Sequence, residues 1–593
     1  MCGIFAYTGR QTDAAPRVLE GLKRLEYRGY DSWGVAVRSD SSIAVQKQVG
    51  KIGDARVALP PSAVGFGHTR WATHGGVTEA NAHPHISQER GLALVHNGII
   101  ENHQTLRRDV LAAGGRIQSE TDTEVALHLI ADALPRHERS AAALADAVRE
   151  VFARLEGMNA LIALEAGSAA LVAVKNGSPL CIGYGEDGNY IASDAAALLP
   201  HTRRVTFLGD GQLVIVGPDR VTIHDAATGE LLAADIVELD WKVEQAELGQ
   251  HQHYLSKEID EQAELIRMTA LTQTETAQQL ANMIRSSSAS FLIGCGTAAN
   301  AALTGQYLFS RVAGRHVAVG VGSEFDCLEH LLTSKSLVIA LSQSGETIDV
   351  LEPLIRAKKQ KNVRIAALVN VLGSTLYRMA DFNALLKAGP EKCVLATKSY
   401  TAKLAVLTLT AYALAGRLEQ GRQLLLRAAD LVEEQLSQAS RARIAELAER
   451  IYRCEHMFLI GRCLSYASSL EAALKIKEVS YIHAEGFAAG ELKHGVIALI
   501  EPGTPCVVFA PNDETQRGIF SSAEELRARG GYIIGVSPTP SDVFDFHIPV
   551  GDAGDAAPIV QAAPIQLLAY YLALKRGADP DKPRNLAKSV TVK

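Results

Sequence analysis

Phe291-Leu292-Ile293-Gly294-Cys295-Gly296-Thr297 is a short apolar run that enters a glycine turn, and the helix-forming stretch 298–312 follows it. The order returns at Leu337–Leu341, an apolar run that enters Ser342-Gln343-Ser344-Gly345-Glu346-Thr347 ahead of a second helix-forming stretch, 348–358. Strands that alternate with helices in this way predict a parallel sheet with helices on both faces. The C-terminal half is therefore expected to be doubly wound α/β.

Both units recur later in the chain. The run 458–464 repeats the first unit, with Gly461 in the place of Gly294. The run 507–515 repeats the second unit, with Thr515 in the place of Thr347. The two offsets along the chain agree to within one position, which predicts a duplicated domain. The charged stretch 418–450 between the copies predicts a helical connector.

Residues 1–235 follow a different rhythm, in which short β-like runs predominate. Alternating or short apolar patterns predict strands, and three amphipathic stretches predict helices. Few crossover helices separate these strands, so antiparallel sheets in layers are expected. The predicted strands are 33–37, 43–48, 64–68, 92–97, 160–164 and 170–174, and the predicted helices are 18–25, 122–133 and 141–152.

Composition is typical of a cytoplasmic globular protein of about three or four domains, with 593 residues, 47% hydrophobic and 21% charged. The net charge of −7 argues against a nucleic-acid surface. The eight cysteines form no CxxC pair, which argues against a zinc site or a disulfide framework and favours a reducing compartment. No secretory signal is visible, and the longest apolar candidate, Leu404–Gly416, is too short for a membrane helix.

Cys2 follows the initiator methionine, and removal of Met1 would leave a thiol and a free α-amine on one residue. An α-amine has a pKa of about 7.7–8.0 and a cysteine thiol about 8.5, so the amine can act as the base for its own thiol. The position of Cys2 alone favours a cysteine without a function over a catalytic one. A catalytic role therefore needs partners elsewhere in the chain.

Several residues of the first half suit hydrolysis of an amino-acid side-chain amide. Arg70 offers a bidentate guanidinium to an α-carboxylate, and Asp122 offers a carboxylate to an α-ammonium group. Asn97 and the backbone N–H of Gly98 can form an oxyanion hole. Each of them alone is more typical of an ordinary turn or surface residue, and only the combination favours a site.

The runs that contain these residues resemble the class II glutamine amidotransferase domain, whose N-terminal cysteine attacks the glutamine amide and releases ammonia. They are Cys2-Gly3-Ile4, 27–32, Arg70-Trp71-Ala72-Thr73-His74-Gly75 and 96–102. The resemblance implies that Cys2, Asn97 and Gly98 are catalytic and that Arg70, Trp71, Thr73, His74 and Asp122 bind glutamine. Trp71 resembles the gate of an internal ammonia channel, although a buried core tryptophan would fit the sequence too.

The histidines His68, His74, His83, His85 and His96 raise the question of a metal site. Their spacing follows neither a helical i, i+4 pattern nor a zinc finger. No metal is therefore expected, and polar turn histidines are the favoured interpretation.

The turn Ser342–Thr347 lies where a strand enters a helix, and its hydroxyls and backbone amides predict a phosphate cradle. A capping box would use the same residues, and both can hold at once. The second copy has Asp513 in this turn, so one phosphate per two copies is expected. Nucleotide chemistry is not expected, because no GxxxxGK[ST] run occurs and the run 294–296 lacks the third glycine of a dinucleotide motif.

Lys475, Glu478 and His494 are the charged candidates of the second copy. Lys475 and Glu478 are three residues apart and would share a face of a helix. A surface ion pair worth about 0–1 kcal/mol explains this spacing as well. His494 alone is likewise more typical of a residue without a catalytic role.

The runs 475–485 and 490–495 resemble the paired sugar-isomerase (SIS) domains of the glucosamine-6-phosphate synthase family, the isomerising glutamine–fructose-6-phosphate aminotransferases. The ending 583–592 does so too, and the resemblance covers essentially the whole chain. It implies that glutamine and fructose 6-phosphate are converted to glutamate and glucosamine 6-phosphate without a cofactor. This reaction is the first step of amino-sugar (UDP-N-acetylglucosamine) synthesis.

The resemblance also implies roles for single residues. Lys588 would form a Schiff base with the ketose, and Glu478 would carry the proton between C1 and C2. His494 would assist ring opening from the neighbouring subunit of a homodimer with a shared sugar site, and Lys475 would support the site. The implied sugar-phosphate-binding residues are Thr297, Ser342, Gln343, Ser344, Thr347, Glu391 and Val394.

The implied architecture is multi-domain α/β: a four-layer αββα N-terminal-nucleophile glutaminase domain followed by two doubly wound α/β SIS domains. The bounds are 1–235 for the glutaminase domain, 236–284 for the linker and helical lead-in, 285–425 and 426–577 for the two SIS domains, and 578–593 for a tail that closes the sugar site.

Four positions depart from the family pattern. Ala298 and Ala396 stand where serine is common, Trp33 replaces a small residue, and Ala263 stands where a proline commonly follows Glu261-Gln262. Each lost hydroxyl removes at most one hydrogen bond, worth about 0.5–1.5 kcal/mol, so the two alanines are compatible with a weaker sugar affinity and do not imply loss of activity.

Two alternatives stay open at this point. A related enzyme with the same two halves would act on another phosphosugar, because the cradle recognises phosphate better than sugar. A sugar-phosphate-sensing regulator built on SIS domains would have no catalytic need for Cys2, Glu478 or Lys588, and their joint presence weighs against it.

Overall fold

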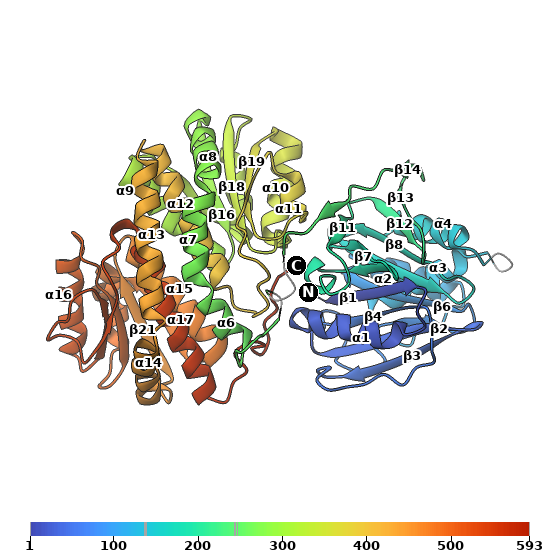
Figure 1. Ribbon diagram of the computed structural model, residues 1–593, viewed down its shortest axis with the longest axis horizontal. Helices are drawn as coiled ribbons and strands as arrows, with labels where there is room; N and C mark the ends of the chain where they lie inside the picture. Colours follow the sequence, from blue (N-terminus) through green and yellow to red (C-terminus); the bar gives the residue numbers. More distant parts are fainter. Residues whose placement is uncertain (1, 136–138, 242–244, 246, 592–593) are drawn as a thin grey trace. The chain divides into compact units, whose positions relative to one another are not determined.

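The computed structural model describes residues 2–135, 139–241, 245 and 247–591, which form two bodies (Figure 1). The first body is Met1–Glu247 with Ala587–Lys593, and the second is Leu248–Leu586. Met1, part of the predicted linker (242–244 and 246) and the end of the predicted tail (592–593) lie outside the described residues. The finer domain bounds stay a prediction.

The first body has two antiparallel sheets between helices. The strand orders are β15-β11-β9-β10-β1-β4-β2-β3 and β14-β13-β12-β8-β7-β6-β5. The strands are β1 (Gly3–Gly9), β2 (Ser32–Ser39), β3 (Ser42–Val49), β4 (Val64–Arg70), β5 (His85–Ser87), β6 (Leu92–Gly98), β7 (Asn159–Glu165), β8 (Leu171–Asn176), β9 (Cys181–Tyr184), β10 (Gly188–Ala192), β11 (Arg204–Phe207), β12 (Gln212–Val216), β13 (Val221–Asp225), β14 (Leu231–Leu232) and β15 (Val237–Glu238). The helices are α1 (Ala14–Leu25), α2 (His103–Ala112), α3 (Asp122–Ala133) and α4 (Ala141–Phe152), with short 3-10 turns η1 (Glu26–Arg28) and η2 (Ala195–Ala197).

Alternation along the strands builds the layers of this body. In β1, Ile4 and Ala6 join the core between the two sheets, whereas Phe5 and Tyr7 join the core under α1. The helices α2, α3 and α4 pack on the outer face of the second sheet. The predicted αββα arrangement is confirmed. All predicted strands and helices of this half appear, but α2, β1, β5 and the short strands from β9 onward were not predicted.

The second body contains two five-stranded parallel sheets with the same strand order, β17-β16-β18-β19-β20 and β22-β21-β23-β24-β25. Their strands are β16 (Ala289–Gly294), β17 (Ala318–Val321), β18 (Ser336–Ser342), β19 (Arg364–Val369), β20 (Phe382–Leu385), β21 (His456–Gly461), β22 (His483–Ala488), β23 (Pro505–Phe509), β24 (Tyr532–Ser537) and β25 (Phe546–Pro549). In each sheet the second strand lies on one side of the first strand and the third strand lies on the other side, so the strand order switches at the first strand. Ligands of such folds bind at the carboxyl ends of the strands at this switch point.

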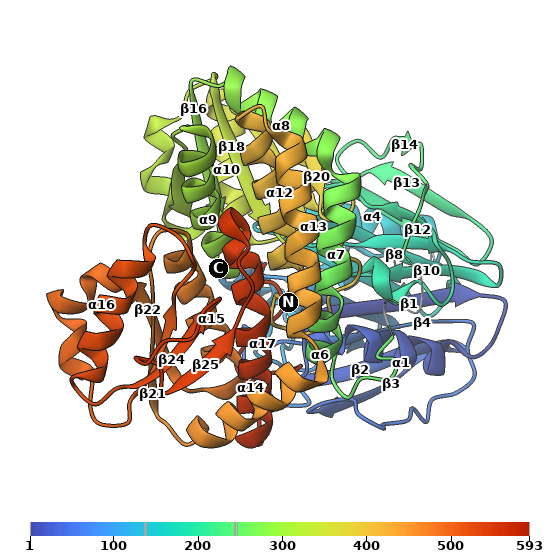
Figure 2. The same cartoon turned by 60° about the vertical axis from the view of Figure 1, so that its left-hand side comes forward.

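Helices cover and connect these sheets. They are α6 (Tyr254–Asp260), α7 (Gln262–Thr272), α8 (Thr274–Ser286), α9 (Thr297–Ala313), α10 (Ile348–Lys361), α11 (Thr375–Met379), α12 (Lys398–Leu414), α13 (Leu418–Gln435), α14 (Gln438–Ile451), α15 (Leu464–Ser480), α16 (Gln516–Arg527) and α17 (Ala557–Lys575). The 3-10 turns are η3 (Gly322–Cys327), η4 (Glu329–Leu331), η5 (Ala489–His494), η6 (Val496–Leu499) and η7 (Gly554–Ala556). The long helices α7 and α13 run side by side, and α15 packs against both α9 and α17 (Figure 2).

The duplication predicted from the sequence is visible element by element. The helices α9 and α15 begin at Thr297 and Leu464, and the turns η3 and η5 begin at Gly322 and Ala489, so both pairs are separated by the same offset along the chain. The predicted connector is the helix pair α13 and α14. One helical stretch of the described residues, Gly554–Lys575, is long and apolar enough to cross a membrane, but 83% of its apolar window is buried inside the protein, as in a core helix.

Candidate active sites

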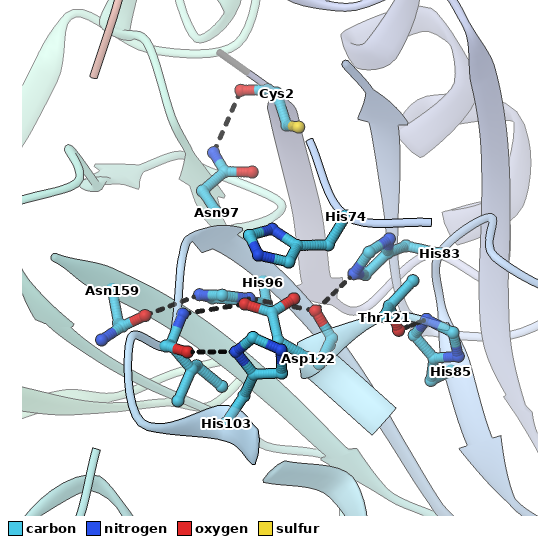
Figure 3. Close-up of polar contacts among 12 residues, drawn as sticks. Cys2, His74, His83, His85, His96, Asn97, His103, Thr121, Asp122 and Asn159 are labelled. Atoms are coloured by element: carbon cyan, nitrogen blue, oxygen red, sulfur yellow. Dashed lines mark hydrogen bonds and ion pairs between the residues drawn. The ribbon is translucent and has the colours of Figure 1, made fainter. Parts of the chain in front are cut away.

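Cys2 lies at the start of β1, beside the end of β4. The backbone N–H of Trp71 donates to its sulfur at 3.2 Å, and the side-chain amide of Asn97 donates to its carbonyl oxygen at 3.0 Å (Figure 3). Burial raises the pKa of the Cys2 thiol. A buried thiol of this kind needs a nearby base before it can act as a nucleophile.

Asn97 and Gly98 end β6. The Oδ1 atom of Asn97 lies 3.1 Å from Nε2 of the buried His68, which fixes the orientation of the amide. Gly98 has φ of +132°, and a Cβ atom there would lie 2.1 Å from the carbonyl oxygen of Met158. Only glycine fits this turn, which sets the direction of the Gly98 peptide.

Arg70 ends β4 and turns onto the loop that follows it. Its guanidinium donates to the carbonyl oxygens of His74, Gly75 and Gly76, at 3.0 Å for Gly76. Burial lowers the pKa of Arg70. These hydrogen bonds stabilise both the loop and the orientation of the guanidinium. A bound carboxylate would have to replace the loop carbonyls as the acceptor of the Arg70 hydrogen bonds. Sequence reasoning missed this contact.

The other predicted glutamine-binding residues surround this loop. Trp71 is half-buried and meets the ring of Tyr30 edge-on at 5.5 Å, so it is not a core tryptophan. Thr73 is exposed, and His74 meets the ring of His103 at 5.0 Å. Asp122 begins α3, where its Oδ2 atom accepts from the backbone N–H of Ile100 at 2.8 Å (Figure 3).

The remaining histidines form a buried cluster rather than the expected polar turns. His83 and His96 both contact the Thr123 hydroxyl, at 2.8 and 3.0 Å, and His85 contacts the Thr121 hydroxyl at 2.8 Å. Burial lowers the pKa of each imidazole, to about 3 for His68 and His85. Within the described residues no group of three metal-binding side chains is found.

In the second body, the turn Ser342–Thr347 connects β18 to α10 at the carboxyl edge of the sheet. Ser342 and Thr347 hydroxyls lie 3.1 Å apart, and Ser342 and Ser344 accept from the N–H groups of Gly345 and Glu346. The half-buried Gln343 accepts from Asn370 N–H through its carbonyl. Thr347 precedes α10 without a side-chain capping bond, so the capping box is not formed.

A buried charge cluster joins α9 to α15. The Lys475 ammonium lies 2.5 Å from the Glu478 carboxylate and 2.9 Å from the Thr297 hydroxyl, and Thr297 donates to Glu471 at 3.0 Å. Asn300 donates to the other Glu471 oxygen at 2.9 Å. Glu478 is the most exposed of the three charged groups, with a 20% exposed side chain against 1% for Lys475 and 4% for Glu471. The interpretation as a surface ion pair is therefore wrong.

Glu471 was missed by the sequence reasoning, although its spacing four residues before Lys475 could have revealed it. Burial raises the pKa of Glu471, against the effect of Lys475. For Lys475, burial acts to lower the pKa, but the Glu478 and Glu471 carboxylates overcome it and the pKa is raised.

The remaining predicted sugar-site residues lie on several segments. Glu391 is buried and accepts from the N–H groups of Thr397 and Ser399 at the start of α12. Val394 is buried beside the tail, and its N–H donates to the Asp581 carbonyl. His494 ends η5 and is exposed, and Lys588 belongs to the segment grouped with the first body.

The second copy uses the equivalent turn differently. Arg311 of α9 and Glu478 of α15 are separated by the same offset as the starts of their helices, so they occupy equivalent helix positions. The Arg311 guanidinium pairs with Glu514 at 2.9 Å and Asp555 at 2.7 Å, and it lies 3.9 Å from Asp513. The turn 511–515 is thus held by a cation from the first copy. One phosphate per two copies stays a prediction.

Comparisons with known proteins identify the family of this chain. A SIS domain model matches residues 283–413 and 450–576, and a glutamine amidotransferase domain model matches 68–200. The glutamine–fructose-6-phosphate aminotransferases (isomerising) of Pyrococcus horikoshii and Aquifex aeolicus are 42% and 40% identical to this chain, each over 100% of both chains. The chain belongs to the isomerising glutamine–fructose-6-phosphate aminotransferase family.

Solved structures add support for the second body. The C-terminal domain of glucosamine-fructose-6-phosphate aminotransferase from Francisella tularensis matches with a TM-score of 0.52 and 31% identity, over 56% of this chain and 99% of that one. Tagatose-6-phosphate ketose/aldose isomerase from Escherichia coli matches with a TM-score of 0.50 and 17% identity, over 57% and 96%, and shows the fold alone.

Two departures from the aminotransferase family pattern now have a physical account. Trp33 is 1% exposed in β2 and packs in the hydrophobic core under α1. The large indole therefore fills core volume that the family's small residue leaves to other side chains. Ala263 is the second residue of α7, a position in the first helical turn where proline and alanine both fit. Ala298 is buried in the first turn of α9, and Ala396 is half-buried before α12.

Proposed function

We propose that this protein converts glutamine and fructose 6-phosphate to glutamate and glucosamine 6-phosphate. The observation that carries the proposal is the presence of both halves of the chemistry in one chain of the family. One half places Cys2 against Asn97, and the other places Lys475 between Glu471 and Glu478, near the carboxyl edge of a SIS sheet.

The first half-reaction takes place at Cys2. After removal of Met1, the α-amine of Cys2 takes the thiol proton, and the thiolate attacks the amide carbon of glutamine. Asn97 and the Gly98 N–H stabilise the oxyanion, ammonia leaves, and water hydrolyses the thioester to glutamate. Arg70, Trp71, Thr73, His74 and Asp122 hold the substrate, with the Arg70 guanidinium exchanging loop carbonyls for the α-carboxylate.

The second half-reaction takes place in the SIS domains. Ser342, Gln343, Ser344 and Thr347 hold the phosphate, and Thr297, Glu391 and Val394 lie by the sugar. Lys588 forms an imine with the C2 carbonyl, with loss of water, and ammonia transferred internally from Cys2 displaces the lysine. Glu478 removes the C1 proton and returns it to C2, which converts the ketose imine to the amino aldose.

The assembly and compartment belong to the same proposal. The exposure of His494 supports its supply to the sugar site of a partner subunit in a homodimer. The eight cysteines, all of them among the described residues, form no disulfide with one another, which supports a cytoplasmic location. The proposed reaction uses only side chains and backbone groups of the protein, and no cofactor is part of the proposal.

A product assay tests the function. The purified protein is incubated with glutamine and fructose 6-phosphate, and products are identified by mass spectrometry. Glucosamine 6-phosphate that forms in step with glutamate is the expected result. Glutamate and ammonia without amino sugar would mean that another phosphosugar is the acceptor. If no glutamate forms, with removal of Met1 verified, the role of Cys2 is contradicted. This result is the one that the alternative of a sugar-phosphate-sensing regulator predicts.

A further inference from the structure

The Asp581 carboxylate is the first of several attachments that hold the start of the tail within the second body. The two oxygens of Asp581 accept hydrogen bonds from the backbone N–H groups of Tyr254 and Leu255, each at 2.8 Å. These N–H groups belong to the first two residues of α6, the first helix of the second body. A helix start leaves such N–H groups without partners in the helix, so Asp581 completes α6 from a position far later in the chain.

The same segment also holds the loop before α12. The carbonyl oxygen of Asp581 accepts from Val394 N–H at 3.1 Å, and that of Pro580 accepts from the Cys393 thiol at 3.4 Å. Glu258 of α6, which is buried, accepts from the N–H of Cys393 at 3.1 Å. The start of α6, the 393–394 loop and the tail therefore form one hydrogen-bonded junction.

A second attachment lies three residues later. The backbone N–H of Arg584 donates to the Tyr481 hydroxyl at 2.8 Å, and the Arg584 guanidinium lies 4.2 Å from the centre of the Tyr481 ring. A cation over an aromatic face is an attractive contact. Tyr481 directly follows α15 and lies only three residues after Glu478. The tail is thereby attached to the helix that carries the buried charge cluster.

Chain length converts these attachments into a limit on Lys588. Lys588 is the fourth residue after Arg584, and an extended chain spans at most about 3.6 Å per residue. The Cα atom of Lys588 can therefore lie no more than about 14 Å from that of Arg584. This limit holds for any placement of the two bodies.

We propose that Asp581 and Tyr481 are positioning residues that fix the tail so that the Lys588 amine meets the sugar carbonyl. Neither touches the sugar, and each acts by restricting the conformations of the segment 582–588. A misplacement of about 1 Å in a reacting group can cost about 100-fold in rate, so loss of an attachment reduces catalysis without removing a catalytic group. This inference rests on the proposed function.

The test compares Asp581→Asn and Tyr481→Phe with the wild type. The asparagine keeps the shape but offers one acceptor oxygen, and the phenylalanine keeps the ring but loses the acceptor for Arg584 N–H. Asp225→Asn is the matched control, because Asp225 also accepts from two backbone N–H groups, but within its own turn in the first body. Three quantities are measured: glutamate release from glutamine alone, formation of glucosamine 6-phosphate, and trapping of the sugar on Lys588.

Trapping uses fructose 6-phosphate and borohydride without glutamine. The Lys588 amine adds to the C2 carbonyl, water leaves, and hydride reduces the imine to a stable amine located by peptide mass spectrometry. We expect both variants to lower the kcat for amino sugar and the trapped fraction about tenfold or more. Glutamate release and the KM for fructose 6-phosphate should stay within about twofold of the wild type.

Three results would overturn the inference, and they are distinguishable. Wild-type trapping and turnover in both variants would show that the attachments do not position Lys588. A parallel fall of glutamate release and amino-sugar formation would show general damage instead. Failure of the wild type itself to trap sugar on Lys588 or to make amino sugar would refute the proposed function, and the inference with it.

Discussion

Lys475 is kept as a cation in an interior that disfavours charge. Its pKa is raised because two carboxylates outweigh the effect of burial, and Thr297 completes its hydrogen bonds. Loss of one partner of such a buried pair typically costs about 3–5 kcal/mol, because the other charge is left uncompensated. The cluster thus orients Glu478, its most exposed member, at a considerable cost in desolvation.

Asn97 offers a direct test of the oxyanion hole. We expect Asn97→Ala to lower the kcat for glutamate release about 100- to 1000-fold, because one preorganised donor to the oxyanion is removed. Asn189→Ala is the control, since its amide donates to the Gly217 carbonyl at 2.8 Å in the same body. Steady-state assays with glutamine alone measure both. A loss of less than about threefold in Asn97→Ala would assign the oxyanion to other donors.

The buried histidines predict acid sensitivity of the first body. Their folded-state pKa values lie below the unfolded value of about 6.5, so the unfolded chain binds more protons between pH 6.5 and about 3. The free energy of unfolding should therefore fall as the pH falls below 6.5, by about 2 kcal/mol at pH 5 for each of His68 and His85.

All three tryptophans, Trp33, Trp71 and Trp241, belong to the first body, so their fluorescence during urea unfolding measures this body alone. His85→Gln keeps a hydrogen-bonding group near Thr121 and should reduce the pH dependence. His224→Gln changes a histidine outside the cluster and is the control. Equal pH dependence in all three proteins would contradict the prediction.

The paired elements α9 and α15 show how far a duplicated backbone constrains its sequence. Gly296 before α9 has φ of +53° and ψ of −126°, and Cys463 before α15 has φ of +49° and ψ of −119°. This region is nearly exclusive to glycine, and other residues there carry about 1–3 kcal/mol of strain. The second copy has kept the turn of the first without its glycine.

Cys463→Gly should therefore stabilise the second body by about 1 kcal/mol, because the strain relieved exceeds the entropy that glycine adds to the unfolded chain. Calorimetry of the full-length protein measures the shift in Tm, with Cys463→Ala as the control that keeps a Cβ atom. A Tm of Cys463→Gly at or below that of Cys463→Ala would show that the turn is not strained.

Most elements could be predicted from the sequence because their apolar periods are local. The runs before α9 and α10 indicated the parallel sheets, and α3 and α4 were predicted with the observed bounds. The short strands from β9 onward carry too few residues to show a period. Contacts such as Arg70 with its own loop, or Asp581 with α6, depend on segments brought together only by folding, and no local pattern indicates them.

Considered as a whole, the protein combines two bodies whose chemistry depends on distant parts of the chain. The sugar site is proposed to use residues from β18, α9, α15, the tail and a partner subunit. Mixing experiments can separate contributions from the same subunit and from its partner, because a symmetric dimer has two equivalent sites.

Mixed dimers should restore activity if His494 acts in the partner's site. Glu478→Gln and His494→Ala are each expected to be inactive in amino-sugar formation. After they are unfolded and refolded together in equal amounts, half of the dimers are mixed and each has one intact site, which gives about one quarter of wild-type activity. Each variant refolded alone is the control. No recovery, with dimers verified by sedimentation, would place His494 in its own subunit's site.

Because of Arg311, the turn 511–515 of the second SIS copy should tolerate charge mutations that the equivalent turn of the first copy does not. Its guanidinium joins Glu514 and Asp555 across the two SIS copies, so charges in the turn 511–515 matter only relative to Arg311. A library that varies these positions together should recover paired charge reversals. The hydroxyl-rich turn of the first copy would accept few changes, alone or in pairs, because its proposed partner is a substrate that cannot mutate in compensation.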